Sequence, residues 1–452
     1  MFINPPAPLK MILVLIVSFG LHTSGQAQNG KPAKTPKINL EESKEGYYGD
    51  KVVDYTNRKY DDEIRSIILH SSASELEPPI INLDGAETLI LRFDDLSEDV
   101  REMNYAFEHC SHDWISSDLQ PMDFQEGFNS DIISDYQFSF NTVRNYTNYR
   151  LEFPNDRIRL TRSGNYIIKV YANNDPEDIM FVARFMLVEP RATVEPTVRN
   201  SSVVSDRDRR QEIDIEVNLG NVPTANPFAE IELVVLQNYR WDNAKRGLKP
   251  SFVKDNTLIY DYQNELTFDG GNEFRFFDAK SVRYRSENVS DVKLEEDGYH
   301  IYLTPQKSRA YSQYMFQRDI NGRLLIKNDD MQDAHLESDY VQVHFTMSVD
   351  AMLGNGNVFI FGQLSNWSLN KDFRMNYNPE NLAYEKTLLL KQGYYNFMYL
   401  WQYVNKETGE TSLTEGNHSE TENEYLILVY FKDQSNFSDR LIGFKKFSTL
   451  AN

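Results

Sequence analysis

Short runs of alternating apolar and polar residues, five to eight residues long, recur along the chain from about residue 50. Examples are TLILRF at 88–93, YQFSF at 136–140 and NYIIKVY at 165–171. Successive side chains of a strand point to opposite faces, so this alternation predicts strands. No helical periodicity is sustained over roughly twelve residues, and clusters of Asp, Asn, Pro and Gly separate the runs. We therefore predict an all-β fold of β-sandwiches.

The strand-rich region is too long for one ordinary hydrophobic core, and two polar interruptions divide it. VEPRATVEPTVRN at 188–200 contains two prolines, and KNDDMQDAH at 327–335 is a second polar break. We expect three immunoglobulin-like or β-sandwich domains in series, comprising residues 46–190, 191–335 and 336–452.

The N-terminal residues predict export from the cytoplasm. Lys10 precedes the apolar run MILVLIVSFGL, and Gly25 and Ala27 are small residues of the kind that precede a cleavage point. We therefore expect residues 1–27 to be a signal peptide, with an uncleaved anchor as the alternative, although the apolar run is short for a membrane span. Residues 28–45 are predicted to be a disordered leader. No cysteine adjoins the cleavage point, so we expect a periplasmic protein without a direct membrane anchor.

The charge of the chain restricts its partners. The formal net charge is −21, which opposes binding to nucleic acid and to anionic lipid surfaces. DRDRR at 206–210 is the candidate basic patch, but two aspartates interrupt it. We expect no nucleic-acid partner.

The segment YAFEHCSHDW at 105–114 contains the residues that most resemble a reactive centre. If the strand continued to its end, Cys110, His112 and Trp114 would share one face. Only Cys110 and His112 could then reach one metal ion, whereas zinc sites normally take three or four protein ligands. We weighed a metalloenzyme centre and a cysteine nucleophile here, and we favour a structural strand. No cofactor, metal site or catalytic residue is expected, and the chain is not expected to be an enzyme.

A C-terminal stretch, VFIFGQLSNWSLNKDFRMNY at 358–377, resembles the early-set, glycogen-binding-like type of immunoglobulin sandwich. In sugar-binding members a tryptophan at the place of Trp367 stacks on a sugar ring. Those members usually add a lysine in a later strand, where this sequence has Met398. The resemblance implies an early-set fold and makes a periplasmic carbohydrate-binding protein, using Trp367, the alternative function.

The order of motifs carries a second resemblance. YDDEIRSIILH, LILRFDDL and YAFEHCSHDW follow one another in the first domain, and GNVFIFGQLSNW and DRLIGF lie near the C-terminus. This order resembles the plug protein family of the bacterial type IX secretion system over nearly the whole mature chain. The resemblance implies a non-enzymatic periplasmic protein. Such a protein closes the periplasmic opening of the very large outer-membrane β-barrel translocon when no cargo is present, and this barrel is its partner.

Overall fold

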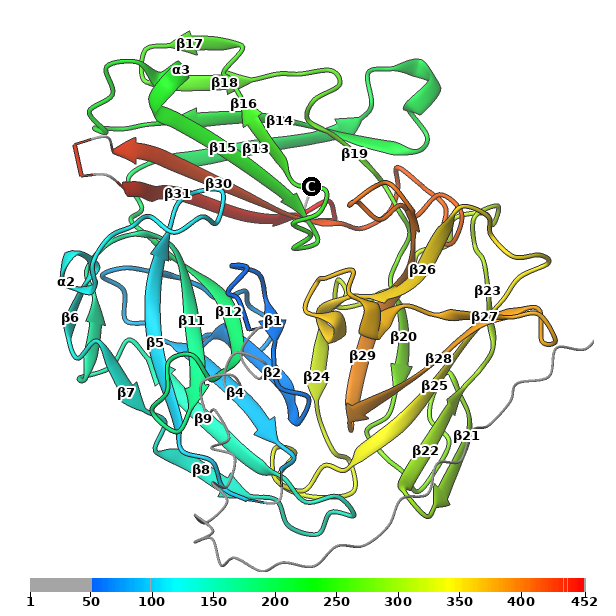
Figure 1. Ribbon diagram of the computed structural model, residues 1–452. Coiled ribbons are helices and arrows are strands. Elements are labelled where there is room, and N and C mark those ends of the chain that lie inside the picture. Colours follow the sequence, from blue (N-terminus) through cyan, green and yellow to red (C-terminus); the bar gives the residue numbers. More distant parts are fainter. Residues whose placement is uncertain (1–50, 98, 434, 437, 451–452) are drawn as a thin grey trace, which may run out of the picture. The chain divides into compact units, whose positions relative to one another are not determined.

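The computed structural model describes residues 51–450 except 98, 434 and 437. The predicted signal peptide and leader lie outside the described residues. Strands make up nearly all of the regular structure, and the only α-helices are the short α2 (Pro121–Phe124) and α3 (Pro227–Glu230) among these residues (Figure 1). The predicted all-β fold class is confirmed. Within the described ranges no helix combines the length and the apolarity needed to cross a bilayer.

The first sandwich contains the strands that precede residue 190. One sheet has the order β1 (Arg58–Lys59), β12 (Ile179–Val188), β11 (Gly164–Ala172), β5 (Met103–Cys110) and β7 (Ser130–Ile132), with β3 (Ile80–Asn82) beside β12. The other has the order β2 (Ile64–Ser71), β4 (Leu89–Asp95), β9 (Thr147–Phe153) and β8 (Asp135–Phe138). Aromatic rings fill the space between the sheets; for example, Phe93 stacks on Tyr149 with 5.0 Å between ring centroids. A small ribbon, β6 (Gln125–Gly127) with β10 (Ile158–Leu160), completes this part.

The second sandwich combines strands from distant parts of the sequence. One sheet contains β13 (Thr193–Asn200), β14 (Arg210–Asn218), β18 (Thr257–Tyr260), β17 (Phe252–Lys254) and β19 (Thr267–Asp269). The other has the order β16 (Lys245–Leu248), β15 (Ile231–Gln237), β30 (Glu424–Asp433) and β31 (Ser438–Ser448). The last two strands of the chain therefore complete a core that begins near residue 192.

The third sandwich is also assembled across the predicted domain boundary. One sheet joins β20 (Arg275–Asp278), β24 (Leu324–Ile326) and β26 (Gly356–Phe361) to β29 (Gly393–Tyr403). The other contains β21 (Val289–Glu295), β22 (Gly298–Leu303), β23 (Gln306–Lys307), β25 (Tyr340–Ser348), β28 (Ala383–Lys391) and β27 (Asn376–Asn378). Trp401, Phe397 and Phe277 lie in its core.

This strand order differs from three consecutive domains. Strands on both sides of the predicted boundary between residues 335 and 336 pair with one another in three sheets: β15 with β30, β20 with β29, and β22 with β25. A polar stretch such as 327–335 has the same composition whether it links two domains or forms a loop within one. The regions 191–335 and 336–452 are therefore interleaved. The change near residue 190 falls between β12 and β13, which belong to different sheets.

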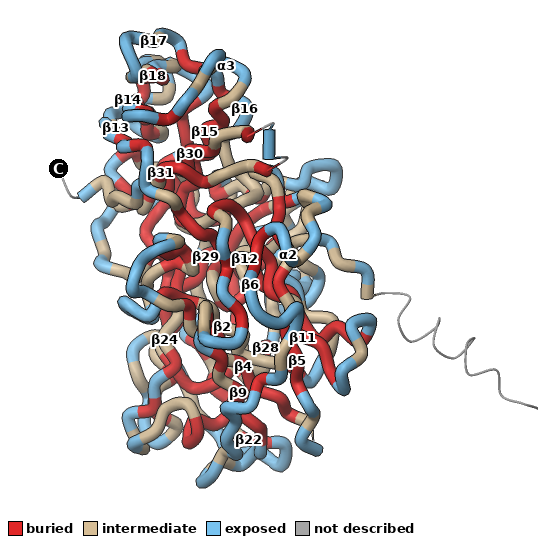
Figure 2. Tube along the Cα trace, turned by 90° about the vertical axis from the view of Figure 1, so that its left-hand side faces the viewer, coloured by how far each residue is buried: buried red, intermediate tan, exposed pale blue. Residues whose placement is uncertain are grey.

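The strands β11 and β12 are buried along almost their whole length, as Figure 2 shows in red. Their inner residues belong to the first core, while Ile167 and Val182 pack against Val234 and Leu428 of the second sandwich. Burial on both faces explains why FVARFMLVE reads as a nearly continuous apolar run rather than as an alternating one.

A buried ion pair joins the first sandwich to the third. Lys391 Nζ, at the end of β28, lies 2.6 Å from Asp94 Oδ2 of β4, and both side chains are about 1% exposed. Asp94 also accepts hydrogen bonds from Tyr340 Oη and Asn148 Nδ2. Lys391 donates to the carbonyl of His335. Each charge is therefore compensated, which a charge removed from water requires.

Candidate functional site

Three of the four tryptophans line one cleft, with a volume of about 110 Å³. Trp114 follows β5, Trp241 follows β15, and Trp367 follows the 3-10 turn η2 (Gln363–Ser365). Arg184 of β12 lies between two of them, with its guanidinium carbon 4.3 Å from the centroid of the Trp114 ring and 5.4 Å from that of Trp241. The two indoles meet edge to face at 5.3 Å. This packing is a cation–π arrangement.

Arg184 contributes one positive charge to a cleft that Glu75 and Glu77 also line. Burial, reinforced by the nearby Arg246, lowers the pKa of Arg184 to about 9, so the guanidinium remains protonated at neutral pH. Its Nε donates a 2.5 Å hydrogen bond to the carbonyl of Tyr55, and among the described residues no carboxylate lies within 4.0 Å of it. A cation between aromatic rings can bind a small anionic or planar group. The described lining residues include Glu75 and Glu77 but no Ser, Thr, Cys, His or Lys.

Trp367 is half-buried in this cleft. Its ring contacts Tyr239 (6.0 Å between centroids), Phe361 (5.9 Å) and Phe274 (6.5 Å). A side chain added at Gly322 would come within 2.7 Å of the indole. The ring is thus engaged with protein neighbours on several sides, and sugar stacking at Trp367 stays a prediction. Met398, which replaces the expected lysine, is buried in the same aromatic cluster.

A second feature is an exposed apolar surface at the edges of two sheets. We call residues 128–143 the aromatic edge; its exposed large apolar side chains are Phe128, Ile132, Tyr136, Phe138, Phe140 and Val143. The strands β7 and β8 in this segment are the edge strands of the two sheets of the first sandwich. The sequence alternation at YQFSF predicted a strand correctly, but all four residues of β8 are exposed. Sequence reasoning missed this surface, and the density of aromatic residues in 128–140 was its only signal.

Comparison with known proteins places this fold. The model of the type 9 secretion system plug protein first domain matches residues 64–189. The chain belongs to the type 9 secretion system plug protein family. The crystal structure of a hypothetical protein from Parabacteroides merdae is similar over 88% of this chain and 100% of that chain, with 33% sequence identity and a TM-score of 0.86. No curated protein matches the chain.

The plug protein family is a non-enzymatic structural family, and the segment 105–114 fits that description. Strand β5 ends at Cys110, and Ser111–Trp114 form a turn, so the expected common face does not extend to His112 and Trp114. Burial raises the pKa of the Cys110 thiol to about 12, which leaves it without nucleophilic thiolate at neutral pH. His112 Nδ1 instead lies 2.7 Å from Asp439 Oδ2 of β31.

Trp114 and His109, from the same segment, also have structural surroundings. Trp114 packs in the cleft described above, and His109 lies in the first sandwich, with Nδ1 2.9 Å from Ser117 Oγ and its ring edge on Tyr166. Cys110 and His112 belong to none of the three groups of potential metal ligands found among the described residues.

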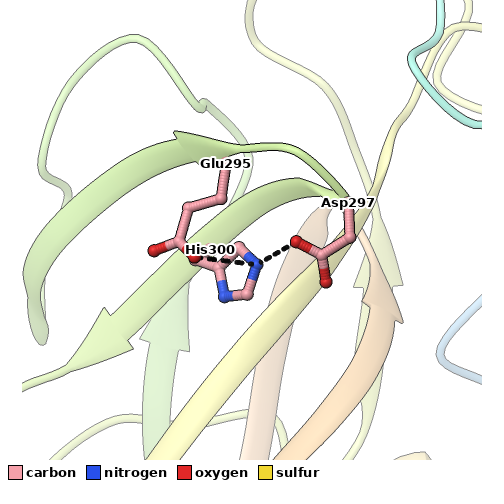
Figure 3. A group of neighbouring side chains, drawn as sticks. All are labelled: Glu295, Asp297 and His300. Carbon is pink, nitrogen blue, oxygen red and sulfur yellow. Dashed lines mark hydrogen bonds and ion pairs between the residues drawn. The ribbon is translucent and has the colours of Figure 1, made fainter.

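One of those three groups lies at the tip of the β21–β22 hairpin (Figure 3). His300 Nε2 is 2.8 Å from Asp297 Oδ1 and 3.8 Å from Glu295 Oε2, and His300 Nδ1 is 2.8 Å from His344 Nε2. Glu295 and Asp297 are both exposed. Their hydrogen bonds and ion pairs with His300 account for this arrangement as a stabilised turn. The sequence analysis did not predict this group, although its three members lie within EEDGYH at 295–300.

Acid should destabilise this plug-family protein through His109. Burial lowers the pKa of His109 to about 4, against 6.5 for a free histidine. The unfolded chain therefore binds a proton between pH 6.5 and 4 that the folded chain does not, so the free energy of unfolding falls as pH falls through this range. The loss approaches roughly 3 kcal/mol near pH 4.

Urea denaturation of the wild type and of His109→Gln, each at pH 7.5 and 4.5, measures this effect. The difference in unfolding free energy between the two pH values should be smaller for the variant, which cannot titrate at this position. An equal difference in the two proteins would contradict the assignment to His109.

Proposed function

We propose that this protein is the plug of a type IX secretion translocon. In the periplasm it closes the periplasmic opening of the outer-membrane export barrel when no cargo is present, and it associates with the outer membrane only through that barrel. The observation that carries this proposal is the match of residues 64–189 to the plug protein first domain. These residues contain the two main sheets of the first sandwich, apart from the two-residue strand β1.

A plug must keep its shape when it blocks an opening. Interleaved strands and buried polar contacts between the first and third sandwiches meet this requirement. Besides the Asp94–Lys391 pair, Tyr146 Oη donates to the carbonyls of His335 and Ser338, and the amide of Val143 donates to Asp339 Oδ1. Val143 is the last residue of the aromatic edge and Tyr146 follows closely, so their bonds fix the C-terminal end of that edge relative to the third sandwich.

The aromatic edge is the surface that we propose contacts the barrel. It lies inside the family-matched segment, and protein interfaces are enriched in aromatic residues and arginine. Arg157 lies over the ring of Phe128, with 4.9 Å between the guanidinium carbon and the ring centroid. Exposed edge strands also leave backbone N–H and C=O groups available for pairing with another β-structure.

Mild detergent extraction of cells that carry a tagged full-length protein tests the plug function. The wild type should recover a very large outer-membrane barrel, and removal of the gene should increase the permeability of the outer membrane. Recovery of a free monomer after gentle extraction would contradict the plug function.

A single substitution tests the contact surface separately. Phe138→Glu places a charge in the aromatic edge and should reduce the recovered barrel at least roughly ten-fold, because a charge at an apolar interface is left desolvated and unpaired. Phe252→Glu is the matched control: Phe252 is 58% exposed, close to the 61% of Phe138, but lies on β17 of the second sandwich. If the wild type recovers the barrel and Phe138→Glu recovers as much, the contact surface lies elsewhere while the plug function stands.

A further inference from the structure

Three carboxylates from separate segments meet next to the third sandwich. Glu273 precedes β20, Asp319 lies between β23 and β24, and Glu422 precedes β30. One oxygen of each carboxylate lies within 4.8 Å of the others. Glu273 is only 1% exposed, and the other two side chains are partly buried.

Within the described part of the chain, no positive side chain forms an ion pair with this carboxylate cluster. Among the described residues, no Lys, Arg or His nitrogen lies within 4.0 Å of a carboxylate oxygen of Glu273, Asp319 or Glu422. The nearby Arg309 is paired with Glu415 instead and donates only to the backbone carbonyl of Glu273. Like charges this close repel one another strongly where water is scarce, so the cluster needs a positive partner or a proton.

Two buried oxygens in the cluster lack hydrogen-bond partners. They are Glu273 Oε2 and Asn321 Oδ1, and Asn321 is about 9% exposed. The amide of Asn321 belongs to the cluster: its Nδ2 is 3.4 Å from Glu422 Oε1, and its backbone N–H donates to Asp319 Oδ1 at 2.6 Å. Rotating this amide by half a turn would present Oδ1 to the carboxylates. Buried oxygens without partners are rare in native proteins, and a water molecule or a bound ion commonly supplies the missing contact.

We propose that Glu273, Asp319, Asn321 and Glu422 bind a calcium ion. All the donors are hard carboxylate or amide oxygens, which suit Ca²⁺, whereas zinc and other transition metals favour sites with imidazole or thiolate. Ca²⁺ also tolerates irregular geometry, unlike Mg²⁺, which demands a near-octahedral shell. The ion supplies the positive charge that the three carboxylates lack, a partner for Glu273 Oε2 and, once the amide is rotated, a partner for Asn321 Oδ1.

The calcium ion would join three segments that are far apart in sequence. One of them, residues 308–323, carries the exposed apolar side chains of Tyr311, Met315 and Phe316. Tyr314 in the same segment already donates a hydrogen bond to Glu273 Oε1. Bound calcium would therefore hold this apolar loop against the second and third sandwiches. The proposal is independent of the plug function.

Isothermal titration of the full chain with CaCl₂, after treatment with EDTA and dialysis, tests the site. The informative variant is Glu273→Gln, because its Oε1 can still accept from Tyr314 Oη and the amide of Glu422 while the charge at Oε2 is removed. Glu295→Gln is the matched control, since Glu295 belongs to the exposed hairpin group with His300. Glu422→Gln serves if Glu273→Gln does not fold.

The wild type should bind one Ca²⁺ per chain, and its melting temperature should rise with calcium concentration, as for any ligand that binds the folded state. Glu273→Gln should lose at least roughly ten-fold in calcium affinity, and Glu295→Gln should be unchanged. In EDTA, Glu273→Gln should melt above the wild type, because one repelling charge is gone. A wild type without saturable calcium binding, or equal affinity in Glu273→Gln, would overturn the proposal.

Discussion

Replacing Lys391 with methionine should lower the free energy of unfolding by about 3–5 kcal/mol, because it leaves the carboxylate of Asp94 buried without its cation. Both side chains are about 1% exposed, so water cannot take the place of the ammonium group. The burial of Lys391 lowers its pKa, although Asp94 opposes that effect. The free energy of unfolding is measured from the first transition in urea denaturation, and the melting temperature is measured separately by heating.

The double variant Asp94→Asn/Lys391→Met shows how much of the loss comes from leaving the Asp94 charge buried and unpaired. Removing both charges should cost less than removing Lys391 alone, since no isolated charge remains and the new amide oxygen at position 94 could still accept from Tyr340. Lys406→Met, at an exposed ion pair with Glu410, is the control and should leave the midpoint unchanged. A Lys391→Met variant that unfolds at the wild-type midpoint would show that the junction does not depend on this pair.

Replacing Glu415 with alanine is expected to have an effect of similar size, about 3–5 kcal/mol. Glu415 is fully buried, and its carboxylate accepts hydrogen bonds from Arg275, Arg309 and the backbone N–H of Tyr399. The alanine variant leaves two arginines without their common anion, and Arg275 is itself buried.

The loss should be local as well as global. Arg309 begins the exposed loop that carries Tyr311, so trypsin should cleave the Glu415→Ala variant after Arg309 or Arg318 faster than the wild type. Glu407→Ala, at an exposed position of the neighbouring loop, is the control. It should resemble the wild type both in its free energy of unfolding and in its rate of cleavage by trypsin. Equal proteolysis of wild type and Glu415→Ala would mean that other contacts hold the loop.

The local part of this fold could be predicted from sequence, because strand alternation is a local property. NYIIKVY became the core of β11. The apolar run FVARFMLVE became β12, although burial on both faces removes the alternation there. The same rule could not tell the largely buried YRLEF from the exposed YQFSF, since both have the same pattern. The two strands are neighbours in one sheet, where β9 is internal and β8 is at the edge. Pairings such as β15 with β30 join segments about two hundred residues apart and leave no local trace.

The sites also combine local features, which the sequence shows, with long-range contacts, which it does not. The turn before Trp367 was visible as a family-like motif, but Trp114 and Trp241 reach the cleft from other sandwiches. Asp94 and Lys391 are separated by 297 positions, and each looks like an ordinary surface charge when read alone. In a chain with 68 acidic residues, nothing in the sequence distinguishes Glu273, Asp319 and Glu422 from the solvated majority.

The pairing of β15 with β30 also sets an order of events during folding. The first sandwich has nearly all its strands once residue 188 has emerged into the compartment where the protein folds. The second has β13 to β19 available early, yet one edge of β15 stays open until β30 arrives some two hundred residues later. An open edge next to apolar residues invites pairing with other chains. The second sandwich is therefore prone to pair with other chains until β30 completes its sheet.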